Sequence, residues 1–230
     1  MNRQIRLNII TYTVFLLLAT AGIFYGNGII NNYSSLRVWT GINLVLLLSG
    51  VPFLFVFRKA GIPDFWQPEI SNKTRLGLPF LTGILFGAAD VLVFRIILHP
   101  EPYSDLPPFA QPFPYSFFLY FSGAFETEVF YRLIPLTIIC LAGMWFRKGK
   151  YFHWFVCSGA VLTSVREPLE QLQAGELWIT AYALLSGFLM NFIQALQFRN
   201  KGFIAPLSLR LGHYVVWHIM LGAYIQFIEL

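Results

Sequence analysis

Long runs of apolar residues, separated by short polar segments, dominate the pattern of this 230-residue chain. A helix needs about 20 mostly apolar residues to cross the hydrocarbon core of a bilayer. Seven runs meet or approach that length. We therefore predict an all-α fold: a polytopic integral membrane helix bundle with about seven transmembrane helices in a single domain. The predicted spans are 7–26, 38–57, 76–98, 115–146, 151–165, 177–198 and 203–227.

Two of the connections between spans are longer than simple turns. Residues 60–75 include Asp64 and Glu69 and predict a loop at the membrane interface. Residues 99–114 contain six prolines and no lysine or arginine, which predicts a loop without regular helix. Pro135 lies inside the long fourth span and predicts a bend there.

Basic residues outside the spans indicate which side of the membrane each loop faces. If the N-terminus is cytoplasmic, eleven lysines and arginines lie on the cytoplasmic side and only Arg37 and Arg166 on the other. Cytoplasmic loops normally carry such an excess, so we predict a cytoplasmic N-terminus, and we expect an integral protein of a bacterial cytoplasmic membrane. The eleven residues are Arg3, Arg6, Arg58, Lys59, Lys73, Arg75, Arg147, Lys148, Lys150, Arg199 and Lys201.

The composition excludes an ordinary soluble domain. Charged residues make up 12% of the chain and hydrophobic residues 57%, whereas soluble proteins carry about 25% charged residues. The net charge of +5 comes from clusters beside apolar runs, which is typical of membrane-flanking loops rather than of a nucleic-acid surface. We therefore expect membrane lipid, and no nucleic acid, among the partners.

Six charged residues fall inside the predicted spans. An ionised side chain at the centre of an isolated membrane helix costs about 2.5–3.5 kcal/mol. These residues must therefore pair or line a watered cavity, and we expect them to converge on one interior spot. The histidines His213 and His218 add two groups that can titrate. The six charged residues are Asp90, Arg95, Glu126, Glu128, Arg132 and Arg210.

Helical spacing indicates which of these side chains can meet. Glu128 and Arg132 are four residues apart and can pair directly. Glu126 points almost opposite to Glu128, because two residues turn a helix by about 200°. His213 lies near the middle of its own span, so we expect it at the level of Arg132 and of either Glu126 or Glu128.

The stretch Thr127-Glu128-Val129-Phe130-Tyr131-Arg132 resembles the first motif of the CAAX prenyl endopeptidases and bacteriocin-processing membrane proteins, the CPBP family. That motif has two adjacent glutamates, three residues and then an arginine, commonly after an aromatic residue. His213 resembles the histidine of the family's third motif. The order and spacing of the helices also look similar from about residue 75 onward.

The resemblance implies a polar cavity in which a glutamate activates water and histidines with an amide stabilise the oxyanion. Three positions depart from it. Thr127 replaces the first glutamate, Arg166 stands where the second motif has histidine, and Trp217 takes the place of an asparagine. Thr127 cannot act as a base near neutral pH, and Glu126 is rotated from its position by about 100°.

The resulting expectation is a divergent CPBP-type intramembrane endopeptidase, with catalysis either retained or lost. Its substrate would be a peptide or a prenylated or membrane protein, without cofactor or metal. The expected catalytic residues are Glu126, Glu128, Arg132 and His213. The expected cavity residues are Arg166, Trp217, His218, Asp90 and Arg210.

Simpler interpretations stay open for these residues. Glu128 and Arg132 can form a purely structural ion pair, and Glu126 can pair with Arg95 or Arg210. The chain would then be a non-catalytic membrane binding or scaffolding protein. Two weaker alternatives are an exosortase-type transpeptidase using Cys157 and a transporter. The pattern lacks the paired half-helices broken by glycine and proline that are typical of transporters.

Overall fold

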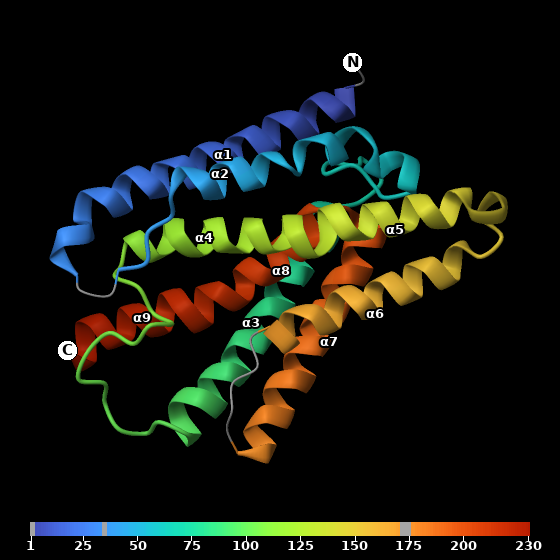
Figure 1. The fold of residues 1–230 in the computed structure, drawn as a ribbon. Helices are drawn as coiled ribbons and strands as arrows, with labels where there is room; N and C mark the ends of the chain where they lie inside the picture. Colours follow the sequence, from blue (N-terminus) through green and yellow to red (C-terminus); the bar gives the residue numbers. More distant parts are fainter. Residues whose placement is uncertain (1–2, 34–35, 171–175) are drawn as a thin grey trace.

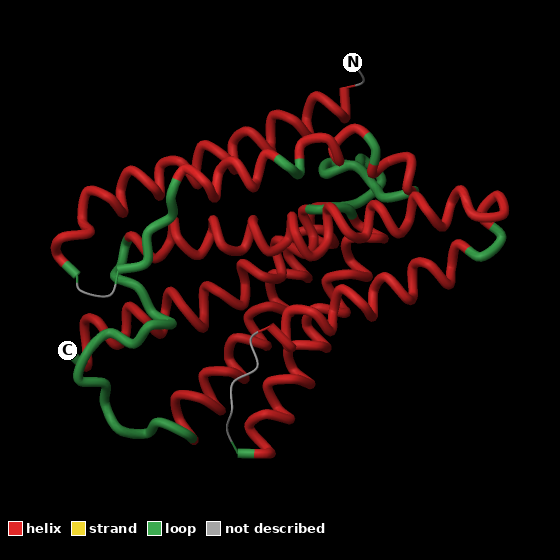
Figure 2. The backbone as a smooth tube through the Cα atoms, in the orientation of Figure 1, coloured by secondary structure: helices red, strands yellow, loops and turns green. Residues whose placement is uncertain are grey.

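The fold is that of a computed structural model, which describes residues 3–33, 36–170 and 176–230. These residues form helices and connecting loops, with no β-strand among them (Figures 1 and 2). The α-helices are α1 (Arg3–Ile29), α2 (Gly41–Leu48), α3 (Leu78–Asp90), α4 (Tyr115–Glu128), α5 (Ile134–Trp145), α6 (Phe152–Glu170), α7 (Leu177–Lys201), α8 (Ile204–Tyr214) and α9 (Leu221–Tyr224).

Five continuous helical stretches are long and apolar enough to cross a membrane. They correspond to the first, third, fourth, sixth and seventh predicted spans, and each extends a few residues beyond its predicted span at one end or both. Short π-helical turns join α4 to α5 (Val129–Leu133) and α8 to α9 (Val215–Met220). The five stretches are Arg3–Asn32, Lys73–Ile97, Tyr115–Gly149, Leu177–Lys201 and Ile204–Glu229. The count of seven and the cytoplasmic N-terminus stay predictions.

The second predicted span is broken. The α2 helix has only eight residues, and a separate 3₁₀ helix, Val51–Phe55, follows it. Pro52 lies in that second piece and cannot donate a backbone hydrogen bond. The hydroxyl of Tyr12 in α1 donates to the carbonyl of Leu47 at 2.6 Å, which satisfies a carbonyl at the break. The segment is therefore a shorter apolar helix than predicted.

The fifth and fourth spans differ from prediction in smaller ways. The α6 helix continues to Glu170, past the predicted end at residue 165, and is not among the five long apolar stretches. Figure 1 shows α4 and α5 following nearly one line, so the bend expected at Pro135 is slight. The π-helical turn directly before Pro135 accommodates the missing backbone donor.

The α8 helix lies at the centre of the bundle, in contact with α3, α4 and α7. Figure 1 shows α1 and α2 running along one side of α4, with α6 beside α5. The crossing of α3 and α8 is very close, because a Cβ on Gly83 would lie 1.9 Å from the carbonyl oxygen of Leu209. A Cβ on Gly212 would similarly lie 2.1 Å from that of Phe80. Glycines at such crossings let membrane helices approach backbone to backbone.

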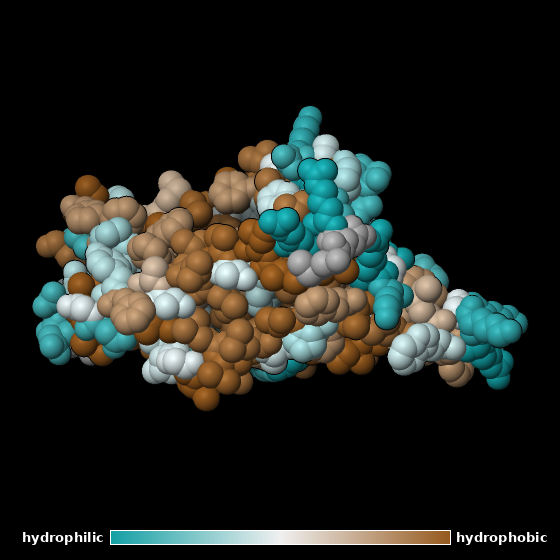
Figure 3. Space-filling model, turned by 90° about the horizontal axis from the view of Figure 1, so that it is seen from above, coloured by the Kyte–Doolittle hydropathy of each residue, from teal (hydrophilic) through white to brown (hydrophobic). Residues whose placement is uncertain are grey.

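Apolar side chains cover the outside of the bundle as well as its core. Figure 3 shows a broad apolar surface whose hydrophilic residues collect mainly toward the ends of the molecule. Leu17 and Leu85 are 62% and 71% exposed. Exposed apolar side chains are favourable in contact with lipid chains, so this surface agrees with an integral membrane protein.

The segment at 60–75 is folded back onto the bundle. Asp64 is buried and accepts a hydrogen bond from Asn8 of α1 at 2.9 Å. Arg75 is also buried and donates to the carbonyl of Phe65 at 2.9 Å. Two charged residues of the expected interfacial loop therefore fix its position.

Candidate functional site

Six buried polar side chains meet where α4, α6, α7 and α8 come together. We call this group the ion cluster. Each of its members is at most 5% exposed, although four carry formal charges. The ion cluster consists of Glu128, Arg132, Glu167, Asn191, Gln194 and Arg210.

Arg210 is the centre of the ion cluster. Its Nε donates to Glu128 at 2.7 Å, and its two terminal nitrogens donate to the two carboxylate oxygens of Glu167, both at 2.7 Å. One terminal nitrogen also reaches the side-chain oxygens of Asn191 at 3.2 Å and Gln194 at 3.1 Å. A planar guanidinium with five donors suits this fork-like recognition of carboxylates.

Arg132 completes the ion cluster from the other side. Its Nε lies 3.6 Å from Glu128, as the four-residue spacing predicted, and a terminal nitrogen lies 3.7 Å from Glu167. The other terminal nitrogen donates to Gln194 at 2.9 Å and to the side chain of Asn191. Two carboxylates and two guanidiniums thus balance each other in charge.

Two amides from one face of α7 tie the ion cluster together. Asn191 and Gln194 are three residues apart, so both side chains reach the same neighbours. Gln194 donates to Glu128 at 2.8 Å and to the backbone carbonyl of Pro206 at 3.2 Å. Asn191 donates to the carbonyl of Gly187 at 2.7 Å, which leaves its oxygen for the arginines. Glu128 therefore meets two guanidiniums and an amide.

A second polar group lies beside the ion cluster, one turn farther along α8. His213 is 7% exposed, and its Nε2 lies 2.7 Å from a carboxylate oxygen of Asp90 in α3. Tyr182 of α7 donates to the other oxygen of Asp90 at 2.8 Å. The Nδ1 of His213 is buried and has no hydrogen-bond partner among the described residues. These three residues form the histidine group.

Glu126 lies outside both groups, so of the two alternatives Glu128 is the glutamate that lies with Arg132. Glu126 is half-buried, and its side chain hydrogen-bonds to Asn43 of α2. The predicted opposition of Glu126 and Glu128 on α4 explains this placement. Neither suggested partner is available, because Arg210 binds Glu128 and Glu167 and Arg95 binds Glu229 near the C-terminus.

Arg166 lies outside the ion cluster, in contrast to its predicted place in a cavity. Its side chain is 54% exposed, pairs with Glu170 at 2.8 Å and covers the ring of Tyr131 at 4.6 Å. The hydrogen bond from Tyr131 and the contact with Arg166 together hold the pKa of Glu170 below its ordinary value. Glu167, the next residue after Arg166, is the one that points inward.

Trp217 and His218 hold the proline-rich loop rather than the ion cluster. Trp217 stacks on Phe109 of that loop with ring centres 5.0 Å apart. The Nδ1 of His218 donates to the carbonyl of Phe109 at 2.6 Å, and its ring stacks on Tyr120 at 4.1 Å. Both residues therefore fix a loop against the helices. Cys157 lies beside His153 at 3.4 Å, one turn away on α6.

Sequence reasoning missed four residues of these two groups: Glu167, Asn191, Gln194 and Tyr182. The sequence does point to Asn191 and Gln194, because two amide side chains three positions apart lie in a span that has no charged residue. Glu167 fell just outside the predicted fifth span. The expectation that the buried charges converge is confirmed for Glu128, Arg132 and Arg210, with Asp90 close by in the histidine group, and is wrong for Arg95 and Glu126.

The described residues contain no group of three or more histidine, cysteine, aspartate or glutamate side chains that could hold a metal ion. No family model, curated protein or solved structure matches the chain.

Proposed function

We propose that this chain is a non-catalytic membrane protein that acts by binding or scaffolding, on a helical framework of the CPBP type. One observation carries the proposal: Arg210 and Glu167 fill the space beside Glu128 and Arg132. Water activation by a carboxylate requires an oxygen that can approach water and take its proton. Glu128 is fully buried. Its Oε1 accepts from Arg210 and Gln194, and its Oε2 faces the guanidinium of Arg132 at 3.6 Å, so this glutamate serves instead to hold helices together.

The energetics of burial support the same interpretation. Removing one partner from a buried ion pair typically costs about 3–5 kcal/mol, because the remaining charge has no counterion. Such pairs join α4, α6 and α8 in the ion cluster, and the amides of α7 connect the fourth helix to them. Its residues therefore have a structural reason to be present that needs no reaction.

A peptidase assay tests the proposal. Purified protein in lipid nanodiscs is incubated with a mixed library of prenylated and unmodified peptides. We expect equal, background turnover from the wild type and from a Glu126→Gln, Glu128→Gln double variant. The exposed Glu101→Gln serves as the matched control. Turnover by the wild type that disappears in the double variant would overturn the proposal and restore the glutamates as catalytic residues.

A second candidate function, intramembrane hydrolysis, is favoured by the histidine group. The buried Nδ1 of His213 lacks a partner among the described residues, and Asp90 holds the opposite nitrogen. In this arrangement Nδ1 would accept a proton from water, while Asp90 orients the imidazole and Tyr182 holds Asp90. The active groups would then lie one turn from the ion cluster.

The same peptide library separates the two candidates. Hydrolysis through the histidine group predicts turnover that is lost in His213→Gln, falls at least tenfold in Asp90→Asn and persists in Glu126→Gln. His153→Gln, an exposed histidine on α6, is the control. Turnover unaffected by His213→Gln would exclude this second function.

A further inference from the structure

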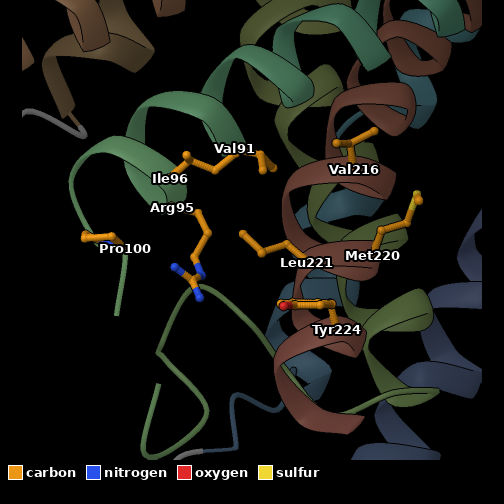
Figure 4. A pocket seen from close by; sticks show the side chains of 8 residues that line it. All are labelled: Val91, Arg95, Ile96, Pro100, Val216, Met220, Leu221 and Tyr224. Carbon is orange, nitrogen blue, oxygen red and sulfur yellow. The ribbon is translucent and has the colours of Figure 1, made fainter. Parts of the chain in front are cut away.

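A lateral groove opens between α3 and α9, beyond the glycine crossing. Figure 1 shows α3 and α9 diverging from each other, and a π-helical segment, Val91–Ile97, continues α3 on one side of the space. The space between them is a groove of about 490 Å³, within the range of about 300–1,000 Å³ for small-ligand sites. Figure 4 shows the residues that line it: Val91, Arg95, Ile96, Pro100, Val216, Met220, Leu221 and Tyr224.

The walls of the groove are apolar along most of its length. Only Arg95 and Tyr224 among the lining side chains carry a hydrogen-bonding group. The stretch from Val216 to Tyr224 rises about 12 Å at 1.5 Å per residue. Half of a hydrocarbon core is about 15 Å thick, so the groove has the length of one leaflet's apolar layer.

The polar end of the groove lies where the helices finish. Arg95 forms an ion pair with Glu229 and donates to the carbonyl of His99. Glu229 also accepts a hydrogen bond from the backbone of Tyr103 at 2.8 Å. The Nε of Arg95 has no hydrogen-bond partner in the described parts of the chain. In Figure 4 the guanidinium of Arg95 and Tyr224 lie at one end, and Val91 and Val216 at the other.

We propose that this groove binds one membrane phospholipid, with an acyl chain along its apolar walls and the phosphate beside Arg95. The groove is complementary to such a lipid: it is apolar along its length, and the guanidinium of Arg95, held by Glu229, lies at the end of the helices. A phosphate is the anionic group of a phospholipid at that depth, and basic residues between membrane helices bind lipid head groups. The inference rests on the proposed binding function and names the class of ligand.

Other occupants fit the groove less well. A peptide strand would leave its backbone groups without partners against these walls, at a cost of several kcal/mol each. An alkyl chain has no polar groups to satisfy and fills a narrow apolar space.

Native mass spectrometry of protein released from nanodiscs tests the proposal. The nanodiscs contain either a phospholipid alone or that phospholipid with an equal amount of diacylglycerol bearing the same chains. We expect the wild type to retain one phospholipid and to prefer it over diacylglycerol by about fivefold, the effect of one basic residue near a membrane surface. Arg95→Gln should lose this preference, whereas Arg6→Gln, which removes an exposed arginine, should keep it.

Two variants test the apolar walls. Val216→Phe and Ile96→Phe narrow the groove from opposite sides, and each should reduce phospholipid retention several-fold. Val45→Phe, at a 60% exposed position on α2, is the matched control and should retain lipid like the wild type. If Val216→Phe does not fold, Ile96→Phe still provides the test, because Ile96 is 58% exposed.

Two outcomes would overturn the proposal. The first is equal lipid retention by the wall variants and the wild type, and the second is equal binding of phospholipid and diacylglycerol by the wild type. The lipid measurement uses no peptide, so its failure is distinct from turnover in the peptidase assay. Either lipid outcome refutes the ligand, whereas peptide turnover refutes the proposed binding function.

Discussion

Arg210 shows how a single residue decides the character of a buried site. Its guanidinium binds Glu128 on one side and both oxygens of Glu167 on another. A lysine at this position could not form the same bonds, because its single ammonium lacks the planar fork. The arginine at position 210 therefore engages both carboxylates of the ion cluster.

Replacing Arg210 by methionine should strongly destabilise the protein. The change leaves Glu128 and Glu167 with only Arg132 as counterion, so we expect a loss of about 3–5 kcal/mol in the free energy of unfolding. The double variant Arg210→Met, Glu167→Met has balanced charge and should recover part of that loss. Thermal unfolding in detergent measures both, with the exposed Arg6→Met as control. Equal stability of Arg210→Met and Arg6→Met would contradict the arrangement.

Residue-level prediction from the sequence had a clear limit. The pairing of Glu128 with Arg132 followed from their spacing, because one helix fixes both positions. Partners on different helices, such as Arg210 and Glu167, depend on how those helices pack, and no local spacing encodes that. The partner of Glu126 could not be predicted for the same reason, because Asn43 belongs to another helix, α2.

At the scale of elements, the crossing of α3 and α8 sets the position of the histidine group. Gly87 is close enough that a Cβ would lie 2.8 Å from the carbonyl oxygen of His213. Asp90 follows three residues later on α3, which brings its carboxylate to the imidazole. The close crossing thus determines the geometry of the histidine group.

Alanine at Gly83 should weaken this crossing. Its added Cβ would meet the backbone of α8 at 1.9 Å, so the helices must separate, and we expect a lower thermal stability of the purified protein. A Cβ added at Gly123 on α4 would have no neighbouring atom within 4 Å outside its own helix. Gly123→Ala is therefore the matched control and should be neutral or stabilising by up to about 1 kcal/mol. A Gly83→Ala variant as stable as Gly123→Ala would show that the helices are not in close contact.

Hydropathy predicted the long helices well and the short ones poorly. Length and apolarity are properties of a segment by itself, so the five long stretches follow from the sequence alone. The break after α2 depends on Pro52 and on Tyr12, which reaches Leu47 from another helix. Such a contact cannot be inferred from the composition of the segment it interrupts.

For the whole molecule, the distribution of basic residues predicts one orientation in the membrane. We expect the loop containing Arg147 and Lys148 on the cytoplasmic side and the loop at 99–114 on the opposite side. Single cysteines introduced at Lys148 and Asp105, in a chain whose own Cys140 and Cys157 are replaced, report this through an impermeant thiol reagent. In intact cells the cysteine at position 105 should be labelled, and that at 148 only after permeabilisation. The reverse pattern would contradict the predicted orientation.

The ion cluster also has a consequence for how the protein is made. Glu128, Arg132 and Glu167 leave the ribosome before Arg210, and together they carry one excess negative charge. That excess is neutralised only when α8, the last element of the cluster to be synthesised, enters the membrane beside them. Until then the earlier helices hold one buried carboxylate without a counterion, so we expect a chain that stops before Arg210 to be unstable in the membrane.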